Sequence, residues 1–168
     1  MKSSIFNSDK TFIVAEIGNN HEGNLKVAKD LIRKAATSGV DAVKFQTFIP
    51  EQFVSIKEQL RIDRLRGFQL SYQQFHELSR FANKKGLIFF STPLDINSAK
   101  FLNTIQPIFK ISSGDNNFYK LIETVANFGK PIIISSGIAD INELEKIYKR
   151  IIKIFSLKKK NYKNLAFL

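Results

Sequence analysis

The sequence predicts an α/β fold with parallel strands, because short apolar segments alternate with stretches of helical periodicity along its 168 residues. Strands that are separated by helices pair in parallel, since each connection has to cross a face of the sheet. No G-x-G-x-x-G motif or P-loop follows the first strand, which favours a β/α barrel over a nucleotide-binding doubly wound sheet. A complete barrel has eight strands and roughly 250 residues. The chain is therefore expected to form a partial TIM (β/α) barrel of about five βα units plus the start of strand six.

The first two strands and the helix between them have clear signals in the sequence. Residues 11–18 are rich in β-branched and aromatic side chains and predict the first strand. Asn24 is expected to cap the following helix, and Gly39 to end it. The second predicted strand is AVKFQTF, at 42–48.

A longer connection over 49–70 is expected before the next helix, which begins at Ser71. Gln74 completes a capping box with Ser71, and Leu70 and Phe75 have the spacing of a hydrophobic staple. The remaining predicted elements are strand 87–93, a helix capped by Asp95, strand 107–113, a helix that carries Leu121, Ile122 and Val125 and ends at Gly129, strand 131–137, a helix capped by Asp140 and Glu143, and the start of a sixth strand at 164–168.

Charged and polar residues alternate with apolar ones inside the predicted strands. In a β/α barrel, one set of alternate side chains packs on the helices and the other faces the barrel interior. In the second strand, Val43 and Phe45 are predicted to face the helices, while Lys44 and Gln46 face inward. The same alternation places Ile13, Ala15 and Ile17 on the helix side and Glu16 inside, and it turns Lys110 inward between Phe109 and Ile111.

The first five predicted strands also bring polar residues to their carboxyl ends, where the active sites of such barrels lie. The relevant residues include Thr92, Ser113, Asp115 and Ser135. Two ammonium groups with hydroxyls and loop N–H groups can hold a phosphate and a carboxylate together, so the pattern predicts a site for a small polyanion. Glu16 or Asp115 could then transfer protons or bind sugar hydroxyls. The alternative is an internal Lys–Glu pair that only stabilises the barrel.

The overall composition excludes several classes of protein. There is no cysteine, which excludes disulfides, thiolate metal sites and a cysteine nucleophile. No stretch approaches 18 consecutive apolar residues and the N-terminus lacks an apolar signal core, so a cytoplasmic location without a membrane span is expected. The net charge of +11 is compatible with nucleic-acid binding. However, the densest basic run, Lys158–Lys160 with Lys163, falls in a predicted loop, so nucleic acid is not the expected partner.

Two histidines are present, which is too few for a metal site by themselves. His21 follows the first strand in GNNHEG, where it could contact a substrate or serve a structural role. His76 falls on a predicted helix away from the strand ends and is expected to be an exposed surface residue.

Several motifs occur in a specific order that resembles the sialic acid synthase family, which includes N-acetylneuraminate, legionaminate and pseudaminate synthases. The resemblance covers about residue 11 to the last residue and rests on AEIGNNHEG, KFQT, STP, KISSG and GKPIIISSG. It implies a TIM barrel followed by an antifreeze-like domain in a homodimer. It also implies condensation of phosphoenolpyruvate with an N-acetylated hexosamine, which yields a nonulosonic acid and phosphate.

The resemblance further implies roles for individual residues. Glu16 and Asp115 correspond to acidic groups near the reacting centre, and Gln46 lies at the sugar or its surroundings. At the position of Asp115, better-characterised sialic acid synthases carry a glutamate. The residues implied to contact phosphoenolpyruvate are Lys44, Thr92, Lys110, Ser113 and Ser135.

The family's divalent metal, manganese or magnesium, is implied for the full-length enzyme, with its histidine ligands beyond the fifth strand and outside this chain. Residues 1–168 are accordingly expected to be an incomplete synthase barrel domain, inactive alone, without the second half of the barrel or the antifreeze-like domain. Its open strand edges are expected to make the isolated chain aggregate or pair. The alternative function is a non-catalytic half-barrel that binds an anion or assembles with a separately encoded second half.

Overall fold

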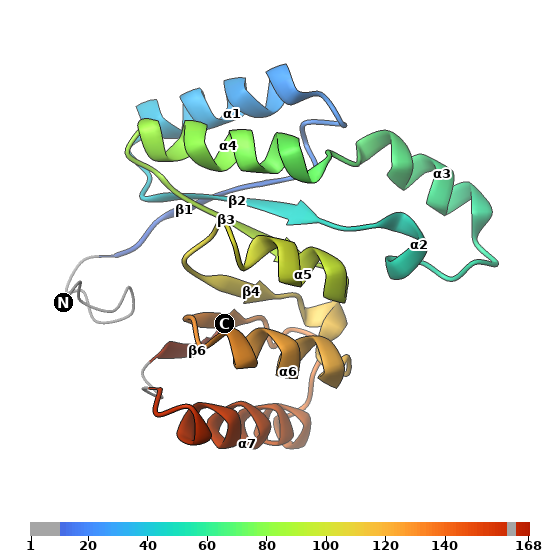
Figure 1. Ribbon diagram of the computed structural model, residues 1–168, viewed down its shortest axis with the longest axis vertical. Helices are drawn as coiled ribbons and strands as arrows, with labels where there is room; N and C mark the ends of the chain where they lie inside the picture. Colours follow the sequence, from blue (N-terminus) through green and yellow to red (C-terminus); the bar gives the residue numbers. More distant parts are fainter. Residues whose placement is uncertain (1–10, 161–163) are drawn as a thin grey trace. The chain divides into compact units, whose positions relative to one another are not determined.

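The computed structural model describes residues 11–160 and 164–168 (Figure 1). Its strands form two three-stranded parallel sheets, in the orders β1-β2-β3 and β4-β5-β6. The chain divides into two compact units, one of Phe12–Gln106 with the first sheet and one that contains Pro107–Leu168 with the second. Helices alternate with the strands in both units, so the predicted parallel α/β arrangement is confirmed.

The first unit begins with β1 (Val14–Gly18), α1 (Leu25–Thr37) and β2 (Ala42–Thr47). In Figure 1, α1 and α4 (Tyr72–Lys84) lie side by side and pack on the strands of this unit. Residues of the strands and of these helices form a buried core between the two layers. This helix-facing cluster consists of Ile17, Ala28, Ile32, Ala35, Val43, Phe45, Leu70, Phe75, Leu78, Ala82, Leu87 and Phe89.

The predicted capping residues set the ends of α1 and α4. Asn24 Oδ1 accepts a hydrogen bond from the backbone N–H of Lys26 at 2.9 Å, which satisfies one of the free donors at the start of α1. Gly39, just beyond the end of α1, has a φ of +75°, which glycine adopts without steric cost. Ser71 and Gln74 form the predicted reciprocal capping box at the start of α4, at 3.2 and 2.8 Å.

The connection predicted over 49–70 contains two helices that the sequence did not indicate, α2 (Pro50–Phe53) and α3 (Gln59–Phe68). Helices are recognised in a sequence chiefly by an apolar stripe. In α3 the only buried residue is Ile62, so no such stripe exists.

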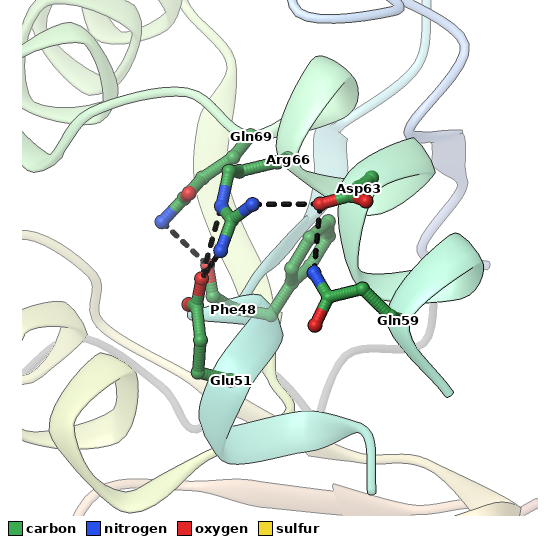
Figure 2. Close-up of polar contacts among 6 residues, drawn as sticks. All are labelled: Phe48, Glu51, Gln59, Asp63, Arg66 and Gln69. Atoms are coloured by element: carbon green, nitrogen blue, oxygen red, sulfur yellow. Dashed lines mark hydrogen bonds and ion pairs between the residues drawn. The ribbon is translucent and has the colours of Figure 1, made fainter. Parts of the chain in front are cut away.

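Arg66 joins α2 and α3 through its guanidinium group (Figure 2). Its Nε and Nη2 donate to Glu51 Oε1 at 3.0 and 2.5 Å, and its Nη1 donates to Asp63 Oδ1 at 2.7 Å. Gln59 Nε2 donates to the same Asp63 oxygen at 2.9 Å. The two helices are therefore held by side-chain contacts between residues that lie up to 15 positions apart, rather than by a buried face.

The first unit ends with β3 (Ile88–Pro93) and α5 (Ile96–Leu102). Asp95 caps α5 as predicted, with Oδ1 accepting from the backbone N–H of Ser98 at 2.7 Å. Its Oδ2 accepts from the backbone N–H of Ile49 at 2.8 Å, so the same buried carboxylate also fixes the chain that leaves β2.

The core of the second unit includes Phe109, which is fully buried and packs against the tilted ring of Phe128 with ring centroids 5.3 Å apart. Gly129 ends the helix that carries Phe128, with a φ of +70° as its predicted role requires. The elements of this unit are β4 (Phe109–Ile111), the 3-10 turn η1 (Ser113–Asp115), α6 (Tyr119–Phe128), β5 (Ile132–Ile134), α7 (Ile141–Leu157) and β6 (Leu165–Phe167).

The two strands predicted over 107–113 and 131–137 are shorter in the structure. They end at Ile111 and Ile134, and the chain turns soon after each of them. After β4, the backbone N–H of Asp115 bonds to the carbonyl of Ser112 at 3.0 Å and begins η1. After β5, the carbonyl of Ser136 accepts a bond that turns the chain toward α7. Of the serines that the sequence placed on these strands, Ser113 lies in η1, whereas Ser112, Ser135 and Ser136 lie just beyond the strand ends.

Asp140 caps α7 by accepting from the backbone N–H of Glu143 at 2.8 Å, as predicted. The prediction that Glu143 also takes part in the cap is wrong, because its carboxylate accepts a hydrogen bond from the Tyr119 hydroxyl instead. A second Glu143 oxygen lies 3.6 Å from the Lys146 ammonium. A contact between α6 and α7 therefore takes the place of the capping contact that the sequence pattern predicted for Glu143.

Predictions for Ile13 and for the basic run after α7 can also be compared with the structure. Ile13 was predicted to pack on the helices, but it precedes β1 and is 51% exposed. Lys158–Lys160 are exposed and follow α7 in a turn, as predicted, whereas Lys163 lies outside the described residues. Within residues 11–160 and 164–168, no helix is long and apolar enough to cross a membrane.

Candidate functional site

Lys44 and Glu16 form an ion pair across β2 and β1, which the parallel register places opposite each other. As predicted, the neighbours of Lys44 on β2, Val43 and Phe45, belong to the helix-facing cluster. The Lys44 side chain is 16% exposed and that of Glu16 is 51% exposed. This is the internal Lys–Glu pair of the structural alternative, and because the Glu16 carboxylate is half exposed, water weakens the attraction between the two charges.

Gln46 and Thr92 stand opposite each other at the carboxyl ends of β2 and β3. The amide of Asn19, which follows β1, donates to Gln46 Oε1 at 2.8 Å and fixes its orientation. Gly18 has a φ of +54°, and a Cβ there would lie 3.3 Å from Glu16 Oε1. The glycine therefore lets the chain turn sharply beside the carboxylate.

Lys110 lies on β4 and is only 7% exposed. Its Nζ donates to Ser135 Oγ at 2.5 Å and to the carbonyl oxygen of Ile111 at 2.6 Å. Ser135 immediately follows β5, so two of the residues that the resemblance implied for the site, Lys110 and Ser135, are in contact within this unit. The charge of this ammonium also acts on the Asp115 carboxyl and favours its ionised form.

Asp115 and Ser113 lie in η1, directly after β4. Burial raises the pKa of the Asp115 carboxyl from 3.8 to about 6, and the nearby Lys110 ammonium opposes this shift. A carboxyl group with a pKa close to neutral can both give and take a proton under physiological conditions. Asp115 is therefore a titratable group close to neutral pH, at the position that the sequence singled out.

Asn116 is the main feature of this region that the sequence prediction missed. It is 5% exposed, and its Nδ2 donates to the carbonyl oxygen of Ser135 at 3.0 Å. Its Oδ1 is buried and has no hydrogen-bond partner in the described part of the chain. The available signal was the pair of asparagines that follows Asp115, a residue type common in turns and in polar binding sites.

His21 is buried, and its ring lies 5.9 Å from that of Phe45, a member of the helix-facing cluster. Its Nδ1 accepts from the backbone N–H of Gly23 at 3.1 Å, and burial lowers the pKa of the imidazole. The structure thus supports the structural role of His21 over substrate contact. His76 is exposed on α4, as predicted.

The predicted site residues gather in two sets, each within one unit. Within the described residues, 11–160 and 164–168, no group of three or more histidine, cysteine, aspartate or glutamate side chains could hold a metal ion. The first set is Glu16, Lys44, Gln46 and Thr92, and the second is Lys110, Ser113, Asp115 and Ser135.

Comparison with known proteins identifies a consistent group of relatives. The sequence model of the NeuB family matches residues 31–168. An uncharacterized protein of Methanocaldococcus jannaschii, MJ1065, is 43% identical over 142 residues, which cover 84% of this chain and 42% of the relative. Human N-acetylneuraminate-9-phosphate synthase is 34% identical over 151 residues, covering 82% of this chain and 42% of the relative.

The crystal structure of N-acetylneuraminic acid synthetase from Leptospira borgpetersenii, in complex with citrate, matches with a TM-score of 0.84 and 30% identity. The match covers 95% of this chain and 53% of that one. It confirms the predicted fold class, in which six parallel strands and their helices make a partial TIM barrel. The chain spans less than half the length of the curated relatives named above.

Proposed function

This chain belongs to the NeuB family, and on that basis we propose that residues 1–168 are part of the barrel domain of a sialic-acid-type synthase. The proposed reaction joins phosphoenolpyruvate to an N-acetylated hexosamine. The methylene carbon of phosphoenolpyruvate attacks the open-chain aldehyde of the sugar and forms the new carbon–carbon bond. Water then adds to the cationic carbon, and phosphate leaves to give a nine-carbon 2-keto acid.

We propose that phosphoenolpyruvate is bound by ammonium and hydroxyl groups at the carboxyl ends of the strands. Charge-assisted hydrogen bonds from ammonium groups to phosphate and carboxylate oxygens are the strongest contacts available for such a ligand. The Leptospira relative was crystallised with citrate, itself a polycarboxylate, which supports an anion site in this family. The proposed binding residues are Lys44, Thr92, Lys110, Ser113 and Ser135, with Gln46 at the sugar.

The observation that carries this proposal is the environment of Lys110. An ammonium group that is 7% exposed has lost most of its hydration, and it donates to Ser135 Oγ and the Ile111 carbonyl at the ends of the strands. Its position and its charge would favour contact with an arriving phosphate or carboxylate. A buried lysine at a strand end is costly for stability alone, so a binding role is the better explanation.

Glu16 and Asp115 are proposed to handle protons during the reaction. The pKa of about 6 at Asp115 suits proton transfer to the sugar oxygen that forms from the aldehyde. Glu16 would exchange its contact with Lys44 for one with the sugar or a water molecule when the anionic substrate binds to the lysine.

A divalent metal, manganese or magnesium, is proposed for the full-length enzyme, where it would polarise the aldehyde. The described residues 11–160 and 164–168 do not provide a suitable ligand cluster, so no step above uses the metal. A homodimer is likewise proposed for the full-length enzyme.

Binding of phosphoenolpyruvate to this chain can be measured by isothermal titration calorimetry. Lys110→Met is expected to weaken binding by about 1.5–3 kcal/mol, the contribution of a hydrogen bond to a charged group. Lys120→Met is the matched control, because Lys120 is an exposed lysine on α6 of the same unit. Equal affinity of both folded variants and the unaltered chain would contradict the proposed role of Lys110.

The reaction itself is tested with the full-length gene product, phosphoenolpyruvate, manganese and a panel of N-acetylhexosamines, with phosphate release as the readout. Release with at least one sugar is expected. Phosphoenolpyruvate binding without release from folded protein would instead favour the alternative, a non-catalytic anion-binding half-barrel.

A further inference from the structure

A pocket of about 450 Å³ lies between α1 and α4, which Figure 1 shows side by side over the first sheet. Its volume is typical of a site for a small molecule. Lys44 projects from the opposite face of that sheet, because its neighbours Val43 and Phe45 belong to the helix-facing cluster. The pocket is therefore on the helix side of the first unit, away from Lys44. Its lining includes Lys29 of α1 and His76, Glu77, Arg80, Phe81 and Lys84 of α4.

Three basic side chains form a row along α4 in this pocket. His76, Arg80 and Lys84 are spaced four residues apart, so they follow one another along the exposed surface of the helix. Arg80 and Lys84 have no ion pair or hydrogen bond within residues 11–160 and 164–168. Like charges at this spacing repel each other. A bound anion would replace that repulsion by the attraction of both side chains to one ligand.

The carboxylate that lines the pocket is already paired. Glu77 forms an ion pair with Lys29, which reaches it from α1. Each of these two charges therefore neutralises the other. The charges of Arg80 and Lys84 remain, so the pocket is positively charged overall.

The Phe81 ring holds further cations beside the row. Lys29, Arg33 and Lys85 lie 5.9, 5.3 and 6.0 Å from its centroid, within the range of a cation–π contact. Arg33 is also paired with Asp30, but Lys85 has no carboxylate partner among the described residues. The positive potential around the pocket is therefore higher than the row alone would produce.

The arrangement favours a phosphate group over other ligands. A guanidinium group can donate two parallel hydrogen bonds to phosphate oxygens, and an ammonium group adds a compact positive charge. A metal ion would be repelled, and a neutral sugar would leave the cations unpaired. The row from His76 to Lys84 rises only about 12 Å along α4, which is enough for one or two phosphate groups. A protein that binds nucleic acid typically contacts about 6–10 phosphates, so a small ligand is the better match.

We propose that this pocket binds a small phosphate-bearing molecule, with Arg80 and Lys84 donating to the phosphate oxygens and Lys29 adding charge from α1. This site goes beyond the proposed synthase reaction, because its residues lie on the helix side of the sheet and not at the strand ends. Free phosphate and the phosphate group of an organic ester share the chemistry that these side chains recognise.

The proposal is tested by NMR titration of the ¹⁵N-labelled chain with inorganic phosphate and, separately, with glucose 6-phosphate. Sodium chloride keeps the ionic strength constant. Saturable shifts of backbone amide signals in α1 and α4 are expected with at least one of the two probes. Tighter binding of glucose 6-phosphate would identify an organic ester as the preferred source, and the reverse would identify free phosphate.

A variant with both Arg80→Gln and Lys84→Gln is expected to weaken this binding about tenfold or more. If it does not fold, Lys84→Gln alone, at the exposed last residue of α4, is expected to weaken binding about threefold. The matched control carries Lys26→Gln and Lys34→Gln. It removes the same charge from exposed positions of α1 that do not line the pocket.

Equal affinity in the folded double variant and its control would overturn the proposal. So would signal changes that sodium chloride alone reproduces, or changes confined to η1 and the ends of β4 and β5. Phosphoenolpyruvate, which also carries a phosphate, is titrated into Lys110→Met, where the signals of α1 and α4 should still respond. Loss of that response would assign the phosphate to the strand ends and reject the pocket, without contradicting the proposed reaction.

Discussion

Lys44 and Lys110 are the same residue type on a strand of each unit, yet their surroundings differ. Lys44 is paired with Glu16, a carboxylate that is about half exposed, because the register of β1 and β2 sets the two opposite each other. Lys110 stands opposite Ile133 in the register of β4 and β5, and its ammonium reaches Ser135 and the Ile111 carbonyl. Lys44 thus has a carboxylate on the neighbouring strand, whereas Lys110 donates to a hydroxyl and a carbonyl oxygen and its charge also acts on the Asp115 carboxyl.

The difference shows what a lysine on a buried strand can be used for. A paired lysine can remain in place without a ligand, and the ligand has to displace the carboxylate. A lysine that donates to a hydroxyl and a carbonyl oxygen has its position fixed without a carboxylate that the ligand must displace, and it can make a charge-assisted contact with an arriving anion. The two lysines are therefore expected to contribute differently to stability and to binding.

The largest expected effect concerns the cores on which the two lysine-bearing strands rest. Phe45→Ala and Phe109→Ala each remove a fully buried ring and are expected to lower the free energy of unfolding by about 3–5 kcal/mol. Phe45 contacts the rings of Phe75 and Phe89, with centroids 6.4 and 5.4 Å away, whereas Phe109 contacts Phe128. The loss is thus expected to be larger at Phe45, as measured by urea unfolding. A greater loss at Phe109 would contradict the comparison, and the two Phe→Leu variants serve as controls.

Lys44→Met should weaken the binding of phosphoenolpyruvate more than it lowers the free energy of unfolding. Phosphoenolpyruvate binding is expected to weaken by about 1.5–3 kcal/mol in calorimetric titration. Stability should change by no more than about 1 kcal/mol, because the Glu16 carboxylate left behind is exposed to water. Lys26→Met, at an exposed position on α1, is the control. Unchanged affinity would leave Lys44 with only the structural role of an internal ion pair.

Asp115 should give the second unit a pH dependence of stability. Its pKa is about 6 in the folded chain and near 3.8 when unfolded, so the folded state binds more protons between these values. Stability is therefore expected to fall as pH rises from about 4 to about 6, and to change no further above that range for this group. Because water reaches the partly exposed carboxyl, the change in the free energy of unfolding is expected to be smaller than about 1.36 kcal/mol per pKa unit. In urea unfolding across this range, Asp115→Asn should remove that component, and an unchanged profile would contradict the assignment.

Glu16→Gln is expected to have the smallest effect and to act in the opposite direction to Lys44→Met. The amide frees Lys44 from its anion, so phosphoenolpyruvate binding should strengthen by about 0.2–1 kcal/mol, the usual contribution of an exposed ion pair. Glu22→Gln, an exposed acidic residue that follows β1, controls for the general change in net charge. Weaker binding in Glu16→Gln would indicate that the carboxylate positions Lys44 instead of competing for it.

Much of the fold could be predicted from short stretches of sequence. The caps at Asn24, Ser71 and Asp95 were predicted correctly because each acts on a backbone N–H within three residues. The inward direction of Lys44 followed from strand alternation, which depends only on its neighbours. The helices within 49–70 could not be predicted, because Glu51 and Arg66 join them across 15 positions.

The candidate site was predicted in part, for the same reason. The residue types at the strand ends and the resemblance of their motifs to a known family identified the ammonium, hydroxyl and carboxyl groups. Asn116 was missed because an asparagine after a strand is usually a turn residue. Only the packing of the chain around it shows that its Oδ1 is buried without a partner in the described residues.

The sequence by itself determined the alternation of strands and helices, the helix starts and the side of each strand from which Lys44 and Lys110 project. These properties arise from interactions between residues close together in the chain. Only the tertiary structure decided that Lys44 meets a carboxylate 28 positions away while Lys110 meets a serine 25 positions away. The physical reason is that such partners are set by sheet register and by the paths of the loops, which depend on the packing of whole elements.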